Sequence, residues 1–185
     1  MDLSLNTKDI DVLARGFKLA EKERPKTIVR AINRSLPKAR TLMNRAVRED
    51  LALPSAYVQE RLKIKNADYK KMAGRVSGVG RPILWGRFKT RASKKGVSAR
   101  INKKGRRVAR GAFLVTLTAG GKAIRTPAVR VGGRYAGTNT LRFKPLYGPS
   151  IPQVLRSKLP KIEPEVAAYL QEQLSKNVDR LMSRI

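Results

Sequence analysis

A central segment of one-sided charge limits what this chain can fold into. Between Arg61 and Lys144 the sequence holds 24 lysines and arginines and one acidic residue, Asp68. Its densest part, Arg87 to Arg110, has 11 basic residues and no acidic one. Like charges at this spacing repel one another, so they oppose compaction and require generous solvation or an anionic partner.

The rest of the chain can supply a hydrophobic core. Hydrophobic residues make up 41% of the 185 positions, which predicts one folded domain over residues 1–185. We divide it into a helical part (1–60), a basic β-rich part (61–148) and a closing segment with a terminal helix (149–185). The net charge of +29 indicates nucleic acid, an acidic protein surface or a crowded assembly as the partner.

Compartment signals are few. There is no cysteine, so disulfides and thiolate metal sites are excluded. The first residues lack the basic-then-apolar order of a signal peptide, and no run approaches the roughly 18 apolar residues of a membrane span. These features predict a soluble intracellular protein with no membrane partner.

Apolar periodicity predicts helices in the first sixty residues. A first helix, capped by Asn6 or Thr7, should end before Pro25, because proline lacks the N–H that a helix interior needs. A second helix should begin at Pro25 and continue through a kink at Pro37, and Ser55 should cap a short third helix. The buried stripe of the first helix should comprise Ile10, Leu13, Ala14, Phe17 and Ala20.

From Leu62 onward the pattern changes to short β-rich segments bounded by glycines. Gly120 and Gly121 should form the turn of an antiparallel hairpin, whose second strand contains Pro127 and is therefore expected at an edge or interrupted. The run KKGRR, Lys103 to Arg107, is expected to be an exposed, mobile loop tip, and Lys103 to Arg110 is expected to be disordered without a partner. The segments expected to be strands are residues 72–78, 96–102, 111–118 and 128–133.

The C-terminal region should be irregular and then helical. Four prolines lie between Thr140 and Lys161, with a short helical turn expected through Val154 and Leu155. A terminal amphipathic helix should begin with Pro164 in its first turn. Helices, a mainly antiparallel sheet with a basic hairpin region and a closing helix together predict an α+β fold. The apolar stripe of the terminal helix, our candidate for subunit packing, is Val166, Leu170, Leu174, Val178 and Leu181, continuing to Ile185.

The sequence offers little for catalysis or cofactor binding. It has no histidine and no cysteine, and Asp68 is the one carboxylate of the middle segment. The spacing of Gly74, Gly78 and Gly80 does not match a phosphate-binding loop, so turns or bulges are expected there. Trp85 is expected to be a half-buried sheet residue rather than a stacking platform. We therefore predict no enzyme activity, no cofactor, no metal and no small-molecule substrate.

The dense basic stretch is the candidate binding site. Phosphate neutralisation on a nucleic acid and docking to an acidic ring of partner subunits explain it equally well, and solvation alone explains it less well. The candidate polyanion or partner-binding residues are Arg87, Lys89, Arg91, Lys94, Lys95, Arg100, Lys103, Lys104, Arg106, Arg107 and Arg110.

From about Pro25 to Arg184 the chain resembles the minor tail protein Z family of long, non-contractile-tailed bacteriophages. The likeness rests on the order and spacing of short motifs and on their basic setting, since no single motif is diagnostic. These motifs are RAINRSLPKARTLMNRAVRED, YVQERLKIKNA, the strand opening at Gly111, LYGPSIPQVL and EQLSKNVDRLM.

The resemblance implies a structural virion protein that acts in tail completion and head–tail joining. It further implies other tail or neck subunits as partners, a homo-oligomeric ring, a head-proximal position after assembly in the host cytoplasm, and contact with the packaged DNA end. The alternative that the charge itself suggests is a free nucleic-acid-binding protein, histone-like or ribosome-associated.

Overall fold

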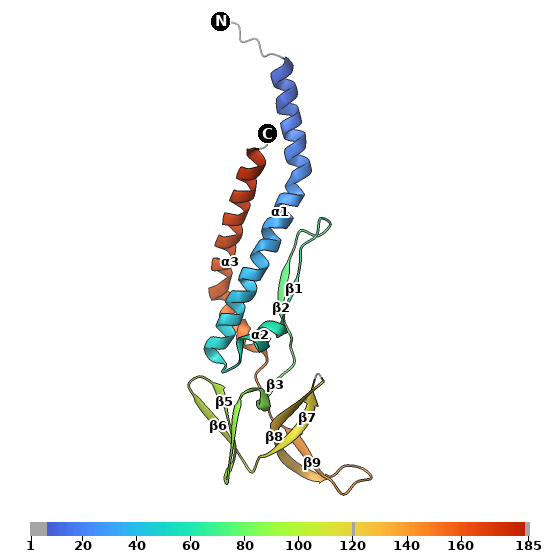
Figure 1. The fold of residues 1–185 in the computed structure, drawn as a ribbon, viewed down its shortest axis with the longest axis vertical. Helices are drawn as coiled ribbons and strands as arrows, with labels where there is room; N and C mark the ends of the chain where they lie inside the picture. The colour runs from blue at the N-terminus through green and yellow to red at the C-terminus, as the bar shows by residue number, and fades with distance from the viewer. Residues whose placement is uncertain (1–6, 120, 184–185) are drawn as a thin grey trace. The chain divides into compact units, whose positions relative to one another are not determined.

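The computed structural model describes the backbone of residues 7–119 and 121–183, with the side chains of 21, 23–118 and 121–183. The described chain is α+β, as predicted, with long helices at both ends and antiparallel strands between them (Figure 1). The helices are α1 (Thr7–Asp50), α2 (Ser55–Arg61), α3 (Ile151–Met182) and the 3-10 turn η1 (Trp85–Arg87). The strands are β1 (Leu62–Lys65), β2 (Arg75–Gly78), β3 (Ile83–Leu84), β4 (Lys89–Ser93), β5 (Gly96–Asn102), β6 (Gly105–Arg110), β7 (Phe113–Ala119), β8 (Lys122–Arg134), β9 (Leu141–Pro145) and β10 (Tyr147–Gly148).

Contacts divide the chain into two compact units, and both long helices contribute to each. We call them the helical unit and the sheet unit and describe each by itself. A single domain over residues 1–185 predicts that the two units unfold together, and this stays a prediction. The helical unit comprises Met1–Leu42, Ile64–Ser77 and Pro160–Ile185, and the sheet unit comprises Met43–Lys63 and Gly78–Leu159.

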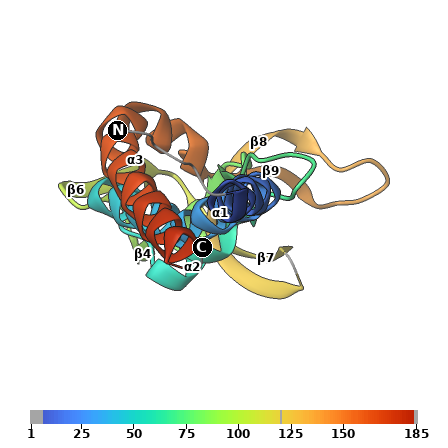
Figure 2. The ribbon, with the colours of Figure 1, turned by 90° about the horizontal axis from the view of Figure 1, so that it is seen from above.

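In the helical unit α1 and α3 run antiparallel, side by side (Figures 1 and 2). Polar contacts join them: Asn177 accepts a hydrogen bond from the Arg34 guanidinium at 3.2 Å and donates one to the Thr27 carbonyl at 3.5 Å. Lys38 pairs with Glu165 at 3.3 Å. The packing of the two helices in this unit therefore depends on satisfied polar side chains as well as apolar area.

Asn33 on α1 holds the segment after β1. Its side-chain oxygen accepts from the Ala67 N–H at 2.8 Å, and its amide nitrogen donates to the Ala67 carbonyl at 3.0 Å. Ala67 is buried, so these two bonds satisfy backbone groups that water does not reach. The absence of a side chain at Gly74 lets the same region approach Leu36 and Ile32 closely.

The helices pass through prolines at which the sequence predicted an end. α1 continues through Pro25, so the predicted end there is wrong, whereas the predicted continuity through Pro37 is confirmed. One proline removes a single backbone bond, and the tertiary packing of the helix as a whole outweighs that loss. Buried side chains of α1 lie on either side of Pro37, including Val29 and Val47. The predicted stripe from Ile10 to Ala20 lies outside the described side chains.

α3 begins at Ile151, so the predicted helical turn through Val154 and Leu155 is confirmed as part of this helix, whereas the predicted irregular structure around that turn and the predicted start at Pro164 are wrong. Pro152 occupies the first turn, where an N–H has no intrahelical partner, and Pro160 and Pro164 lie inside the helix. Ile151, Leu155 and Ile162 are buried with helical spacing and provide the packing that sustains the helix through those prolines.

Ser55 does not cap α2, contrary to the prediction. The residue that precedes the helix is Pro54, and no side-chain cap is formed. The Ser55 hydroxyl instead accepts a hydrogen bond from the Asn44 amide at 3.1 Å. A tertiary partner on α1 has therefore replaced the local capping bond.

The sheet unit contains two three-stranded antiparallel sheets, β4–β5–β6 and β7–β8–β9, and the β3–β10 pair. The predicted hairpin pairs β7 with β8, with Gly121 at φ +72°. Of the two alternatives for the strand that contains Pro127, the edge position is wrong, because β8 is central, whereas the pairing of β8 with β9 is interrupted by a register shift between Arg130 and Arg134. The Pro127 carbonyl accepts a hydrogen bond from the Leu146 N–H at 2.9 Å, and Leu146 lies just beyond β9. The nitrogen of Pro127, which has no hydrogen to donate, therefore faces the point where the pairing of β8 with β9 ends. The largest fully buried side chains of this unit include Leu51, Val58, Leu62, Ile83, Val97 and Ile151.

Candidate anion-binding surface

One face of the β4–β5–β6 sheet is basic. Along β5, Val97, Ala99 and Ile101 are buried, so the alternate residues Ser98 and Arg100 point to the other side. Cross-strand pairing then places further cations on the same side as Arg100. We call this the basic face, and its cations are Lys89, Arg91, Arg100, Arg106 and Arg110.

Lysine pairs extend the basic face at both ends. Lys94 and Lys95 form the β4–β5 turn, and Lys103 and Lys104 form the β5–β6 turn. All four side chains are exposed. The exposure predicted for this region is therefore confirmed, but Gly105–Arg110 forms strand β6, and a mobile loop tip is wrong for that part. Pairing with β5 orders the strand, and alternation sends Arg106 and Arg107 to opposite faces.

Arg106 is bound into the sheet surface. Its guanidinium donates to the Ser98 hydroxyl at 3.1 Å, to the Ser98 carbonyl at 3.1 Å and to the Lys89 carbonyl at 3.2 Å. Arg100 makes one such bond, to the Lys103 carbonyl at 3.3 Å. Arg106 therefore has a structural role, which leaves the other cations of the face freer to meet a partner.

The predicted set of basic residues is not one surface. Arg107 pairs across from Ala99 and lies on the opposite side of the sheet from the basic face. Arg87 belongs to η1, and its guanidinium lies 5.2 Å from the centre of the Tyr57 ring, while that of Arg61 lies at 4.7 Å. Burial raises the pKa of Tyr57 above 10.0 even though these guanidiniums lower it.

No described carboxylate lies within 4 Å of any of the eleven predicted cations. In the described part of the sheet unit, the acids that form ion pairs are Glu49 and Asp50, both with Lys158, at 3.7 and 3.1 Å. The hydrogen bond with Asp50 raises the pKa of Lys158. The cations of the basic face consequently keep their charge available for an external anion.

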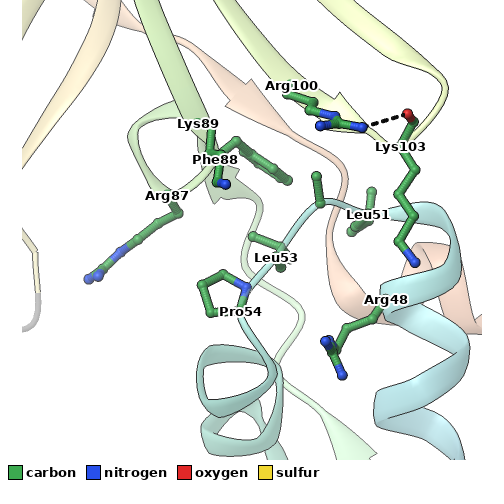
Figure 3. A pocket seen from close by; sticks show the side chains of 10 residues that line it. Arg48, Leu51, Leu53, Pro54, Arg87, Phe88, Lys89, Arg100 and Lys103 are labelled. Atoms are coloured by element: carbon green, nitrogen blue, oxygen red, sulfur yellow. Dashed lines mark hydrogen bonds between the residues drawn. The ribbon is translucent and has the colours of Figure 1, made fainter.

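A hollow of about 470 Å³ adjoins the basic face where α1 ends (Figure 3). Its rim is cationic and its floor is apolar, and the described residues that line it include no acid. In Figure 3 the Lys103 side chain extends toward Arg48 along one side of Leu51, while Arg87 extends away from the centre. We call this the cationic hollow; it is lined by Arg48, Leu51, Ala52, Leu53, Pro54, Arg87, Phe88, Lys89, Arg100 and Lys103.

The hollow includes residues that the sequence did not single out, namely Arg48 and Leu51–Pro54. The basic segment counted along the sequence begins at Arg61, after these residues, so the count of charge could not connect them with β5. The available signal was Arg48 itself, a basic residue in the last turn of a predicted helix, where the helix dipole favours a cation.

The subunit-packing candidates form a separate strip on α3. Val178 is 45% exposed, whereas Val166, Leu170, Leu174 and Leu181 are partly covered. The side chains buried nearby are instead polar, Gln173 and Asn177. Part of the predicted apolar stripe is therefore accessible, while Ile185 lies outside the described residues.

Trp85 is a buried residue of the 3-10 turn η1, next to β3, so the predicted half-buried sheet position is wrong. The described residues include no cluster of three or more potential metal ligands, and none of their helices has the length and apolarity that a membrane crossing requires.

Comparison with known proteins identifies a family for this chain. A family model described as prophage minor tail protein Z (GPZ) matches residues 15–185. No curated protein and no solved structure matches the chain. The family match covers nearly the whole sequence and agrees with the resemblance carried by the helical and strand motifs. The chain belongs to the prophage minor tail protein Z family, and it is accordingly a structural component of a phage tail.

Proposed function

We propose that this tail protein acts in tail completion and head–tail joining, at the head-proximal end of the tail. Its basic face would meet the packaged DNA end or acidic subunits of the tail or neck. The observation that supports this role is the set of exposed cations without carboxylate partners on one face of the β4–β5–β6 sheet. Such a surface gains most from a neighbour of opposite charge.

A ring of copies, assembled in the host cytoplasm, is the arrangement we propose for the virion. The accessible strip on α3 that includes Val178 offers apolar area for a neighbouring copy. Imaging of intact tails that contain this chain would show either a closed ring or isolated copies, and isolated copies would contradict the ring.

Replacement of Arg91, Lys94, Lys95 and Lys104 by serine tests the role of the basic face. These side chains are exposed and none donates a hydrogen bond within the described structure, so the variant should fold. We expect a loss of infectious particles of tenfold or more, measured by titre, because the complementary attraction is removed.

The matched control removes the same charge elsewhere. Lys63, Lys70, Lys71 and Lys161 are also exposed, and their replacement by serine should leave the titre near the wild-type value. Equal loss in both variants would indicate that net charge alone matters. A normal titre for the basic-face variant would refute the proposed role of that face.

A free nucleic-acid-binding protein is the second candidate, since the same cations could neutralise phosphates. With 6–10 phosphate contacts its affinity should fall by roughly 10³–10⁵ between 50 and 200 mM salt. A purified protein that shows this dependence and does not enter tails would favour that alternative.

A further inference from the structure

We propose that the cationic hollow binds an acidic segment of a neighbouring tail protein, with one large apolar side chain of that segment inserted into it. This inference rests on the proposed role as a tail-joining component and specifies one of its partners by chemistry. The occupant is a peptide segment with both carboxylates and an apolar anchor, rather than a phosphate backbone.

The walls of the hollow are built into the sheet. The chain that leaves α1 forms a β-bridge between Leu51 and Asn102, and the Ala52 N–H donates to the Ile101 carbonyl at 2.9 Å. The Lys103 N–H reaches the Asp50 carbonyl at 3.4 Å. These backbone bonds fix the hollow before a partner arrives, which lowers the entropic cost of binding.

Charge complementarity favours an acidic occupant. Arg48, Lys89, Arg100 and Lys103 surround the opening, and Glu49 and Asp50 are engaged by Lys158. Arg100 uses one of its donors on the Lys103 backbone carbonyl, which positions the Arg100 side chain at the rim. Carboxylates placed here would form charge-assisted hydrogen bonds without displacing an internal acid.

The floor and the size of the hollow favour an apolar side chain over nucleic acid. About 470 Å³ lies within the roughly 300–1,000 Å³ range of small binding pockets, and Leu51, Leu53 and Phe88 contribute its base. A phosphate backbone has no group to fill such a base.

The test uses the full chain and a defined probe. The probe is an acetylated and amidated hexapeptide with one tryptophan among aspartates and glutamates, titrated by calorimetry. We expect binding at least tenfold tighter than that of the same peptide with serine in place of tryptophan. A single-stranded oligonucleotide of six thymidines should bind more weakly than the tryptophan peptide.

Two variants locate the binding. Arg48→Ser with Lys103→Ser should weaken peptide binding at least fivefold, whereas the matched control Arg91→Ser with Lys94→Ser should change it less than twofold. Ala52→Glu, which places a carboxylate in the hollow, should weaken it at least tenfold while circular dichroism shows the fold retained. If Ala52→Glu does not fold, the serine pair decides the question.

Three outcomes would overturn the proposal: no peptide binding, equal binding of the serine peptide, or equal loss in the two charge-matched variants. Tighter binding of the oligonucleotide would assign the hollow to nucleic acid instead. The titre experiment on Arg91, Lys94, Lys95 and Lys104 uses residues outside the hollow, so the tail-joining role can stand if the hollow proposal fails.

Discussion

The two units differ in their balance of basic and acidic residues and in how many of their cations form internal ion pairs. The sequence of the helical unit contains 18 basic and 10 acidic residues, and that of the sheet unit contains 24 basic and three acidic. In the helical unit Lys26 pairs with Glu23, Lys38 with Glu165 and Lys176 with Glu172. In the described part of the sheet unit the ion-paired cation is Lys158.

This difference shows that the high net charge is concentrated where it cannot be neutralised internally. Helices permit opposite charges three or four residues apart, as in Lys26 with Glu23. The basic face contains no acid at any cross-strand position, so its cations remain unpaired within the described structure. The helical unit is thus suited to holding its own shape, and the sheet unit to meeting an anion.

The largest loss of stability that we expect comes from replacing a glycine of the sheet unit by alanine. The same replacement in the helical unit should cost less. Gly96 has φ +130°, and an added Cβ would clash with the Ala109 carbonyl oxygen. Gly96→Ala should lower the free energy of unfolding by about 3 kcal/mol or more. In the helical unit Gly74→Ala would meet the end of the Leu36 side chain at 2.8 Å, which can shift, so about 1 kcal/mol is expected.

Urea denaturation followed by circular dichroism and tryptophan fluorescence checks both glycine variants. Trp85 reports on the sheet unit and the helical signal mainly on the long helices. Coincident transitions in Gly96→Ala would support one cooperative domain. Separate transitions would contradict a single cooperative domain. Equal losses of unfolding free energy in the two variants would show that the sheet unit and the helical unit tolerate the added methyl group equally well.

A second prediction concerns the two hydrogen bonds between the Asn33 side chain and the Ala67 backbone in the helical unit. Asn33→Ala leaves the buried N–H and carbonyl of Ala67 without their side-chain partner, and should cost about 2 kcal/mol of unfolding free energy. Asn66→Ala, at an exposed neighbouring position, is the control and should cost less than about 0.5 kcal/mol. Similar values for the two variants would show that the Asn33 bonds add no net stability.

The smallest effect that we expect is the difference in stability between removing Arg106, which is bound into the sheet, and removing Lys104, which is exposed and makes no such bond. Arg106→Ala removes three hydrogen bonds at an exposed site and should cost about 1 kcal/mol, while Lys104→Ala should be nearly neutral. Amide hydrogen exchange in β4 and β5 should accelerate in the Arg106 variant alone. Unchanged exchange would place Arg106 among the cations available to a partner.

Much of the fold was predictable from local pattern. Glycine-bounded, β-rich segments located β5 within its observed bounds and identified the β7–β8 hairpin. Predictions failed at proline and at a cap. Pro25, Pro160 and Pro164 lie inside helices, because burial on the same helices outweighs one missing bond at each site. The Ser55 hydroxyl bonds Asn44, a partner 11 residues away.

The candidate site was predictable in composition but not in arrangement. The run from Arg87 to Arg110 indicated an anion-binding region, yet strand alternation places Arg107 opposite the basic face, and Arg87 lies against Tyr57. The cationic hollow joins Arg48 and Leu51 to residues about fifty positions later in the sequence. A bridge between Leu51 and Asn102 makes that junction, and no local periodicity encodes it.

The sequence alone determined where the charge lies, because charge is a property of each residue and no folding step can supply the missing acids. It also determined the α+β class through the change from helical to alternating period at about Leu62. Only the tertiary structure decided which cations are free, which are bound into the sheet and which surround the cationic hollow. Those outcomes depend on register and on contacts between distant residues, whose energies are absent from any local stretch of sequence.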